Sequence, residues 1–336
     1  MDIILILTIL VVVFALAFDF INGFHDTANA IATSVSTRAL KPRTAIMMAA
    51  TMNFVGALTF TGVAKTITKD IVDPFLLENG SLVILAALVS AIIWNLVTWY
   101  FGIPSSSSHA LIGSIAGAAI SAAGFGILNY SGFIKIIQAL ILSPIIALVG
   151  GFIVMTLLRA VLKNRNLFKA NKRIRYMQIG TAAIQSFTHG TNDAQKAMGI
   201  ITMALIAANL QTSDDIQLWV RIAAATAMGI GTSIGGYKII KTVGGKIMKI
   251  RPIHGIAADL NSAAIIFSAT LLHLPVSTTH VISSSIMGVG SAQRLKGVKW
   301  GVAQKIVLTW VITMPISALV AAIVYQILHQ LMKFIM

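Results

Sequence analysis

The sequence predicts an all-α polytopic membrane protein made of two inverted-topology repeats, with interrupted helices, helical hairpins and about 10–12 membrane segments. Three observations predict this fold class. Apolar residues make up 57% of the 336 positions and charged residues only 10%. Several apolar runs approach or exceed the roughly 20 residues that cross a lipid bilayer. Two sets of polar motifs also recur in the same order in both halves of the chain.

The distribution of the 25 Lys and Arg residues predicts the orientation of the chain. Eighteen of them fall in four loops, at 38–43, 159–175, 238–251 and 294–299. Because cytoplasmic loops carry an excess of Lys and Arg, these loops are expected in the cytoplasm, and both termini are then expected outside the plasma (inner) membrane. The formal charge of +15 would suggest nucleic acid for a soluble chain, but this distribution implies no nucleic-acid partner.

The first half begins with an apolar run at 3–35 that is longer than one crossing, and Asn22-Gly23 predicts a break within it. No basic residue precedes this run, so we expect a retained helix and not a cleaved signal peptide. Pro104 predicts a second break before a run of serines. The later segments of this half are expected at about 44–64, 81–101, 105–123 and 133–162.

The second half repeats this order of features. Its runs are expected at about 177–209 with an interruption near Gly190, and then at about 216–237, 253–273, 275–289 and 302–328. The stretch 23–26 recurs at 190–193, and the stretch 104–109 recurs at 275–280. Two motifs that recur in the same order and at nearly the same offset indicate a duplication.

The predicted division of the chain is a first inverted repeat at 1–162, a basic cytoplasmic linker at 163–176 and a second inverted repeat at 177–336. Five segments separate the starts of the two halves, and this odd number inserts them upside down relative to each other. A re-entrant hairpin in place of two crossings would keep the number odd. Inverted repeats with interrupted helices are typical of secondary transporters, whose binding site lies near the midplane where the halves meet.

The repeated motifs carry a family resemblance. They read GFHDTANA at 23–30 and HGTNDAQKA at 189–197, with Pro-x-Ser-Ser/Thr-Ser/Thr-His at 104–109 and 275–280. With these motifs the chain resembles the inorganic phosphate transporter (PiT) family over nearly its whole length. The resemblance implies symport of phosphate with a cation, usually sodium in eukaryotic members and protons in some bacterial ones. Lys196 stands where the first copy has Asn29, so identical ion binding by the two halves does not follow.

The hydroxyl runs after the two prolines predict an anion site. An anion in a dry site needs hydrogen-bond donors, and neutral donors release it more readily than fixed positive charges do. Each run is expected to open a helix whose free amides and positive dipole end face the ligand. The alternative is that these hydroxyls bond to their own helices or pack helices together. The predicted phosphate ligands are Ser105, Ser106, Ser107, Ser108, Ser277, Thr278 and Thr279.

The two aspartates of the repeated motif predict cation sites, because bare carboxylates would repel the anion. Moving divalent phosphate inward against ~100 mV costs about 4.6 kcal/mol, at ~2.3 kcal/mol per charge, so two cations restore electroneutrality. Alternatively, each aspartate caps a helix without binding an ion, or its carboxyl titrates in a proton-coupled carrier. Sodium is expected at Asp26 and Asp193, with predicted ligands Asn22, Asp26, Asn29, His189, Asn192 and Asp193.

The predicted function is a secondary active transporter that imports inorganic phosphate by symport with cations, sodium ahead of protons, without a cofactor. The alternatives are a proton-coupled (metal-)phosphate symporter, a carrier for another oxyanion such as sulfate, and a channel. An intramembrane hydrolase is disfavoured because the duplication gives every candidate catalytic group a symmetric partner, so we expect no enzyme. The sequence leaves open a homodimer, the role of Lys196, and whether Asp19 and Asp259 line the pathway or bridge helices.

Overall fold

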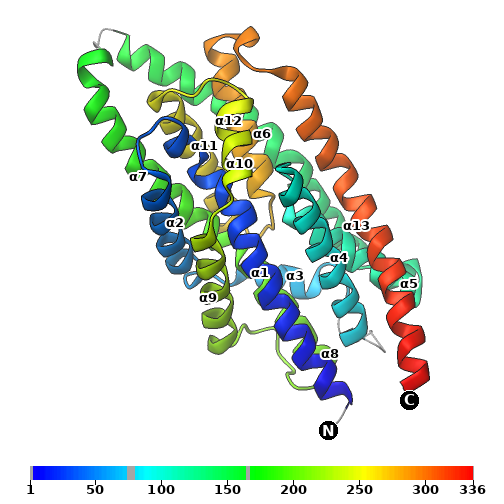
Figure 1. Cartoon of the computed structure of the whole chain (residues 1–336). Coiled ribbons are helices and arrows are strands. Elements are labelled where there is room, and N and C mark those ends of the chain that lie inside the picture. Colours follow the sequence, from blue (N-terminus) through cyan, green and yellow to red (C-terminus); the bar gives the residue numbers. More distant parts are fainter. Residues whose placement is uncertain (1–2, 74–79, 164–166, 336) are drawn as a thin grey trace.

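A computed structural model describes residues 3–73, 80–163 and 167–335, and these residues fold into helices joined by short connections (Figure 1). The first half contains α1 (Ile3–Ser36), α2 (Pro42–Ala57), α3 (Gly62–Lys69), α4 (Gly80–Phe101), α5 (Ser107–Ala123) and α6 (Tyr130–Leu162). The second half contains α7 (Leu167–Asp193), α8 (Gln195–Ala207), α9 (Leu218–Ile234), α10 (Tyr237–Lys241), α11 (Pro252–Leu271), α12 (Thr278–Gln293) and α13 (Trp300–Ile335).

Within the described residues, four helices are long and apolar enough to cross a bilayer by themselves, namely α1, α4, α6 and α13. Two bent pairs pass the same test as broken spans. The bend between α2 and α3 is 69°, and the bend between α9 and the stretch that begins with α10 is 63°. The expected membrane segments are therefore a mixture of full spans, bent pairs and shorter helices, which confirms the predicted all-helical membrane fold with interrupted elements.

The predicted break at Asn22-Gly23 is wrong, because α1 continues through it as one helix. A Cβ atom at Gly23 would lie 2.4 Å from the carbonyl oxygen of Met228 in α9. The glycine therefore allows two helices to approach closely and does not turn the chain. In the second half the long helix does end, but it ends at Asp193, three residues beyond Gly190.

The two prolines mark the turns of two helical hairpins, as predicted. One hairpin consists of α4 and α5 with Pro104 in its turn, and the other consists of α11 and α12 with Pro275 in its turn. Their tips meet inside the molecule, where the Ser108 hydroxyl donates to the carbonyl of Val276 over 2.8 Å. The starts of α5 and α12 therefore lie close together, although they belong to different halves of the chain.

The two sequence repeats interlock in space. Helix α5 packs along α13, and α12 packs in the same way along α6. A Cβ atom at Gly117 would lie 2.1 Å from the carbonyl oxygen of Ala318, and one at Gly288 would lie 2.0 Å from that of Leu148. Because Gly117 and Gly288 occupy matching positions in the two hairpins, one close helix contact occurs twice, and each hairpin is held by the long last helix of the other half.

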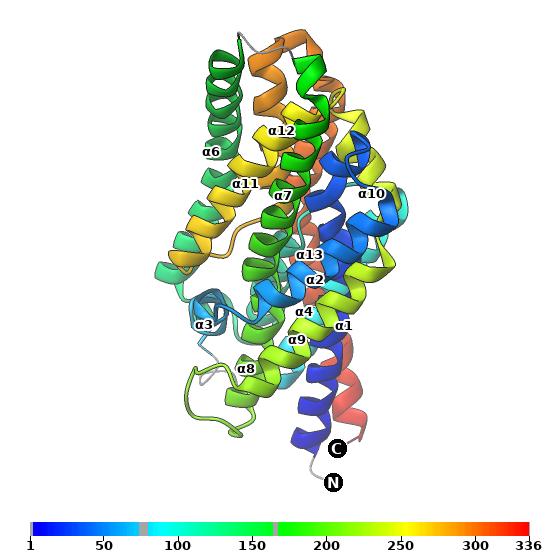
Figure 2. The same cartoon turned by 90° about the vertical axis from the view of Figure 1, so that its left-hand side faces the viewer.

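The start of α1 and the end of α13 lie at one end of the molecule, and the end of α6 and the start of α7 lie at the other (Figures 1 and 2). The basic connections from α1 to α2 and from α12 to α13 also lie in the half away from the termini. This arrangement is compatible with the predicted sidedness, and the placement of the termini outside the cell stays a prediction. Of the predicted linker, residues 167–176 form the first turns of α7, and residues 164–166 lie outside the described part.

Candidate functional site

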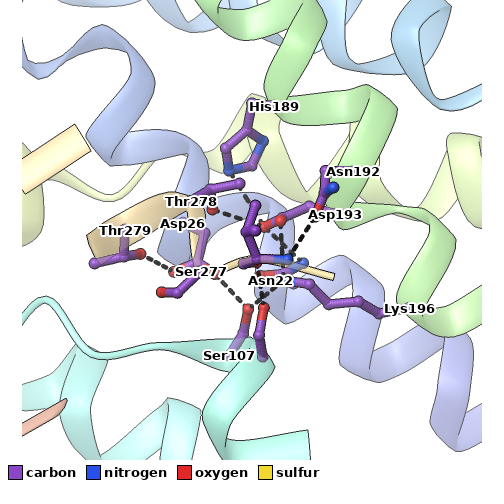
Figure 3. Close-up of polar contacts among 12 residues, drawn as sticks. Asn22, Asp26, Ser107, His189, Asn192, Asp193, Lys196, Ser277, Thr278 and Thr279 are labelled. Carbon is purple, nitrogen blue, oxygen red and sulfur yellow. Dashed lines mark hydrogen bonds and ion pairs between the residues drawn. The ribbon is translucent and has the colours of Figure 1, made fainter. Parts of the chain in front are cut away.

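The candidate site lies where the hairpin tips meet the two helices that carry the repeated aspartates (Figure 3). Asp26 comes from the middle of α1 and Asp193 from the last turn of α7. Ser107 opens α5, and Thr278 and Thr279 open α12. None of these five side chains is more than 1% exposed. Carboxylates at this depth in a membrane protein are costly, which marks the cluster as functional.

Asp26 joins hydroxyls from both halves of the chain. Its Oδ2 accepts a hydrogen bond from Ser107 Oγ over 2.5 Å, and its Oδ1 accepts one from Thr279 Oγ1 over 3.0 Å. The Nδ1 of His25 lies 2.7 Å from the same Oδ1. Asn29 donates its Nδ2 to Thr279 Oγ1 over 2.9 Å. One carboxylate therefore bridges the first turn of α5 and the first turn of α12.

Asp193 repeats this arrangement in the second half. Its Oδ2 accepts from Thr278 Oγ1 over 3.2 Å, as Asp26 accepts from Ser107, and also from Asn22 Nδ2 over 3.4 Å. His189 Nε2 lies 3.3 Å from this oxygen. The two sequence copies therefore present the same contact, a hairpin hydroxyl on a buried carboxylate, from two directions.

Lys196 breaks the symmetry between the two copies. It is 1% exposed, its Nζ lies 2.9 Å from Asp193 Oδ1, and the same atom donates to Ser107 Oγ over 2.9 Å. The first copy has the neutral amide of Asn29 at this position. A buried ammonium is tolerated when it is paired and hydrogen-bonded. Lys196, whose role the sequence left open, therefore contacts a carboxylate. It also contacts the Ser107 hydroxyl, which in turn donates to Asp26.

Two of the seven predicted phosphate ligands cap their own helices. Ser106 is the N-cap of α5 and accepts from the His109 backbone amide over 3.1 Å. Ser277 is the N-cap of α12 and accepts from the His280 backbone amide over 3.2 Å. N-cap hydroxyls satisfy otherwise free helix amides, so both residues define where the helices begin. The rings of His109 and His280 lie against each other with centroids 4.5 Å apart.

Two further predicted phosphate ligands hold the hairpin turns. Ser105 donates to Thr98 Oγ1 over 2.8 Å, within its own hairpin, and Ser108 donates to the opposite hairpin. The hydroxyls that face the aspartates are those of Ser107, Thr278 and Thr279. These three, with the first backbone amides of α5 and α12, form the donor set that an anion between the hairpins would meet.

The predicted cation ligands fall into two groups. Asn192 lies apart from the carboxylates, because its Nδ2 donates to Thr270 and Leu274 and its Oδ1 accepts from the Val276 amide over 3.4 Å. It therefore braces the turn between α11 and α12. The Oδ1 atoms of Asn22 and Asn29 are buried and accept no hydrogen bond from the described residues, so they have capacity for a cation.

Sequence reasoning missed His25 and Thr98. His25 contacts Asp26 through Nδ1 and the Thr98 hydroxyl through Nε2, over 3.1 Å, and both residues are buried. When the two copies of the motif are aligned, His25 occupies the position in the first copy that Asn192 occupies in the second. Two features of the sequence pointed to His25. It is adjacent to the aspartate of the motif, and the alignment of the two copies pairs it with Asn192, a predicted cation ligand.

Three comparisons with known proteins bear on this arrangement. The sequence model of the phosphate transporter family matches residues 22–174 and again residues 163–321. A probable low-affinity inorganic phosphate transporter of Bacillus subtilis (strain 168) is 75% identical over 316 residues, which cover 94% of this chain and 95% of that protein. A protein of the same description from Rhizobium meliloti (strain 1021) is 44% identical over 303 residues, which cover 90% of each chain.

A solved structure described as the sodium-dependent phosphate transporter superimposes with a TM-score of 0.86 at 25% identity. The match covers 96% of this chain and 99% of that chain. The two matched stretches of the family model and this shared fold confirm the predicted duplication and the predicted family resemblance.

Proposed function

This chain belongs to the phosphate transporter family, and we propose that it imports inorganic phosphate by symport with cations, with sodium as the principal coupling ion. As a member it is an integral membrane transporter of inorganic phosphate and not an enzyme. One observation carries the proposal. The hydroxyls best placed to bind an anion are the same hydroxyls that donate to Asp26 and Asp193.

This shared use of donors links the two ligands. A hydroxyl has one hydrogen to donate, so Ser107 and Thr279 can donate either to Asp26 or to phosphate, but not to both. Phosphate that recruits these hydroxyls leaves the buried Asp26 carboxylate with the His25 contact alone, and a cation then compensates its charge. Phosphate binding and cation binding therefore favour each other, and by reciprocity the coupling acts equally in both directions.

The oxygens around Asp26 suit sodium. The carboxylate lies between Asn22 and Asn29 along α1, and the amide oxygens of both asparagines are buried and accept no hydrogen bond from the described residues. Carboxylate and amide oxygens are hard ligands, the kind that hard cations such as sodium prefer. Sodium at Asp26 thus follows from the chemistry of its neighbours, whereas Asp193 already has the ammonium of Lys196 beside it.

Proton coupling is the second candidate, and it is favoured by the contacts of the two buried histidines. His25 lies against Asp26 and His189 against Asp193, so each repeat contains a titratable pair inside the membrane. Such pairs are typical of proton relays in transporters.

The test is uptake of labelled phosphate into proteoliposomes under an imposed inward sodium gradient, with an equal potassium gradient and protein-free liposomes as controls. The proposal predicts uphill accumulation with sodium alone and weak competition by excess unlabelled sulfate. Equilibration without accumulation under every cation gradient would indicate a channel. Accumulation driven only by a proton gradient would support the second candidate.

A further inference from the structure

A third aspartate lies beside the site and has no role in the account above. Asp19 is on α1, about two helical turns before Asp26, and its side chain is 0% exposed. Neither carboxylate oxygen makes a hydrogen bond of ordinary geometry to the described residues. The amide of Asn22 is the side chain next to it, and Asp193 and Lys196 lie within electrostatic range. Asp19 therefore presents a buried carboxylate whose acceptor capacity is unused.

Further unused oxygens lie on the same side of α1. The Oδ1 of Asn22 and both polar atoms of Asn95 in α4 are buried and accept or donate no hydrogen bond within the described residues. The contact of His25 with Thr98 joins α1 to α4. Asn22 precedes His25 by three positions on α1, and Asn95 precedes Thr98 by three positions on α4. Each asparagine therefore lies on the same helix face as the residue it precedes, one turn closer to the N-terminal end of the helix. Both helices run in the same direction (Figure 1).

The charges of the site can be balanced by two cations, but not by one cation at each of the two repeated aspartates. Asp19, Asp26 and Asp193 contribute three negative charges, and Lys196 contributes one positive charge that lies directly on Asp193. With the histidines neutral and all three carboxyls ionised, as they would be with cations bound, two negative charges remain, and they belong to Asp19 and Asp26. The ammonium of Lys196 contacts the Ser107 hydroxyl as well as Asp193. It therefore occupies the place where a cation would contact Asp193.

We propose that the second coupling cation binds at Asp19, with the amide oxygen of Asn95 as a further ligand and that of Asn22 shared with the cation at Asp26, and that Lys196 replaces an inorganic cation at Asp193. The proposal rests on the proposed sodium symport and names where its second ion binds. A carboxylate with amide oxygens is the ligand chemistry of a hard monovalent cation in a broken-helix transporter. Two monovalent cations moving with one divalent phosphate carry no net charge across the membrane.

The first test is Asp19→Asn in proteoliposomes, with labelled phosphate as substrate and sodium as the varied ion at alkaline pH, where phosphate is divalent. The wild-type Hill slope for sodium should be about two, and the variant should fall to about one. Uptake by the variant should also become voltage-sensitive. With one cation, each phosphate carries one net negative charge, so an inside-negative potential of ~100 mV lowers accumulation ~50-fold.

The matched control is Ser186→Ala, because Ser186 occupies in the second repeat the position that Asp19 occupies in the first. Its hydroxyl bonds only to the carbonyl of Ala182 in its own helix, over 2.8 Å, among the described contacts. This variant should keep the wild-type slope and its insensitivity to voltage. Size-exclusion profiles and thermal unfolding in detergent would show whether Asp19→Asn and the control are equally well folded.

The second test is Lys196→Asn, which restores in the second copy the residue of the first and leaves Asp193 without its ammonium. The slope should rise to about three, and an inside-negative potential should now increase accumulation. This change is opposite in sign to that of Asp19→Asn, and it tests the replacement of a cation by Lys196 even if the Asp19 variant does not fold.

Phosphate uptake by the wild type that does not depend on sodium would refute the proposed function itself. A wild-type slope of about two that persists in Asp19→Asn, with no new voltage sensitivity, would refute only the site at Asp19. A slope unchanged in Lys196→Asn would refute the role of the lysine as a counter-cation. If Asp19→Asn changes the response to an imposed proton gradient and leaves the sodium slope intact, the sodium site is likewise refuted.

Discussion

The hydroxyls of Ser107 and Thr278, which occupy matching positions in the two hairpins, should not be equivalent. Ser107→Ala removes two contacts with charged groups, the donation to Asp26 and the acceptance from Lys196. Thr278→Ala removes one, the donation to Asp193, which keeps Lys196 beside it. At ~1.5–3 kcal/mol for a hydrogen bond to a charged group, the first variant should lose about 3–6 kcal/mol of stability without phosphate and the second about 1.5–3 kcal/mol.

The same substitutions each remove one donor to phosphate. Loss of this donor lowers phosphate affinity by at most the ~10- to 150-fold of one whole charged hydrogen bond, less the strength of the bond that the hydroxyl makes to its carboxylate when phosphate is absent. Thermal unfolding of the detergent-solubilised protein without phosphate measures the first effect, and isothermal titration with phosphate measures the second. Equal destabilisation by Thr278→Ala and Ser107→Ala would contradict the added contribution of the contact between Ser107 and Lys196. Wild-type phosphate binding by the double variant would contradict the anion site between the hairpins.

Three further predictions concern groups around the site. Gly117→Ala should cost about 1–3 kcal/mol of stability, because its methyl group would meet the backbone of α13 at 2.1 Å, whereas Gly180→Ala, with no atom within 4 Å, should not destabilise. Asn192→Ala should lower the unfolding temperature but leave the sodium dependence of uptake unchanged, since this side chain braces the α11–α12 turn. The Lys69 ammonium, 3.0 Å from Asp214, holds the pKa of Asp214 below its ordinary value of 3.8. A carboxyl whose pKa is lower in the folded state stabilises the fold at pH values above its unfolded-state pKa. This stabilisation is lost as the pH falls through the folded-state pKa, so Asp214→Asn should reduce the loss of stability in acid.

Each of these predictions has a contradicting result. Equal unfolding temperatures for Gly117→Ala and Gly180→Ala would mean that α5 and α13 pack less closely than described. A lower Hill slope for sodium in phosphate uptake by Asn192→Ala would mean that Asn192 is a cation ligand after all. An acid unfolding profile unchanged by Asp214→Asn would show that its ion pair with Lys69 contributes nothing to stability.

The sequence was sufficient to predict the elements that meet at the site. Each proline precedes a hydroxyl run that opens a helix, and each repeated aspartate lies within reach of one of these helix starts. The physical reason is local, because proline and N-cap chemistry determine where a helix can begin. Duplication then implied that the two starts are related, and the hairpin tips do meet.

Other features depend on partners that no local pattern identifies. Gly23 could have served a turn or a close approach, and only Met228, on α9, decides for close approach. Asn192 is adjacent to Asp193, but neighbouring residues on a helix point about 100° apart, so its amide faces the α11–α12 turn. The contact of Lys196 with Ser107 joins residues from different halves of the chain. Such contacts follow from tertiary packing and not from spacing along the chain.

The most direct test of the account is the sodium dependence of phosphate binding, because the shared hydroxyls of Ser107 and Thr279 make the two ligands cooperative. Phosphate would be titrated into the detergent-solubilised protein at rising sodium and constant ionic strength, with Asp26→Asn in parallel. Phosphate affinity of the wild type should rise with sodium by at least ~5-fold, a typical lower value for coupled sites, and the rise should be clearly smaller in the variant, which keeps only the site at Asp19. Phosphate affinity that is independent of sodium in the wild type, or a sodium effect that is undiminished in Asp26→Asn, would contradict cation binding at Asp26.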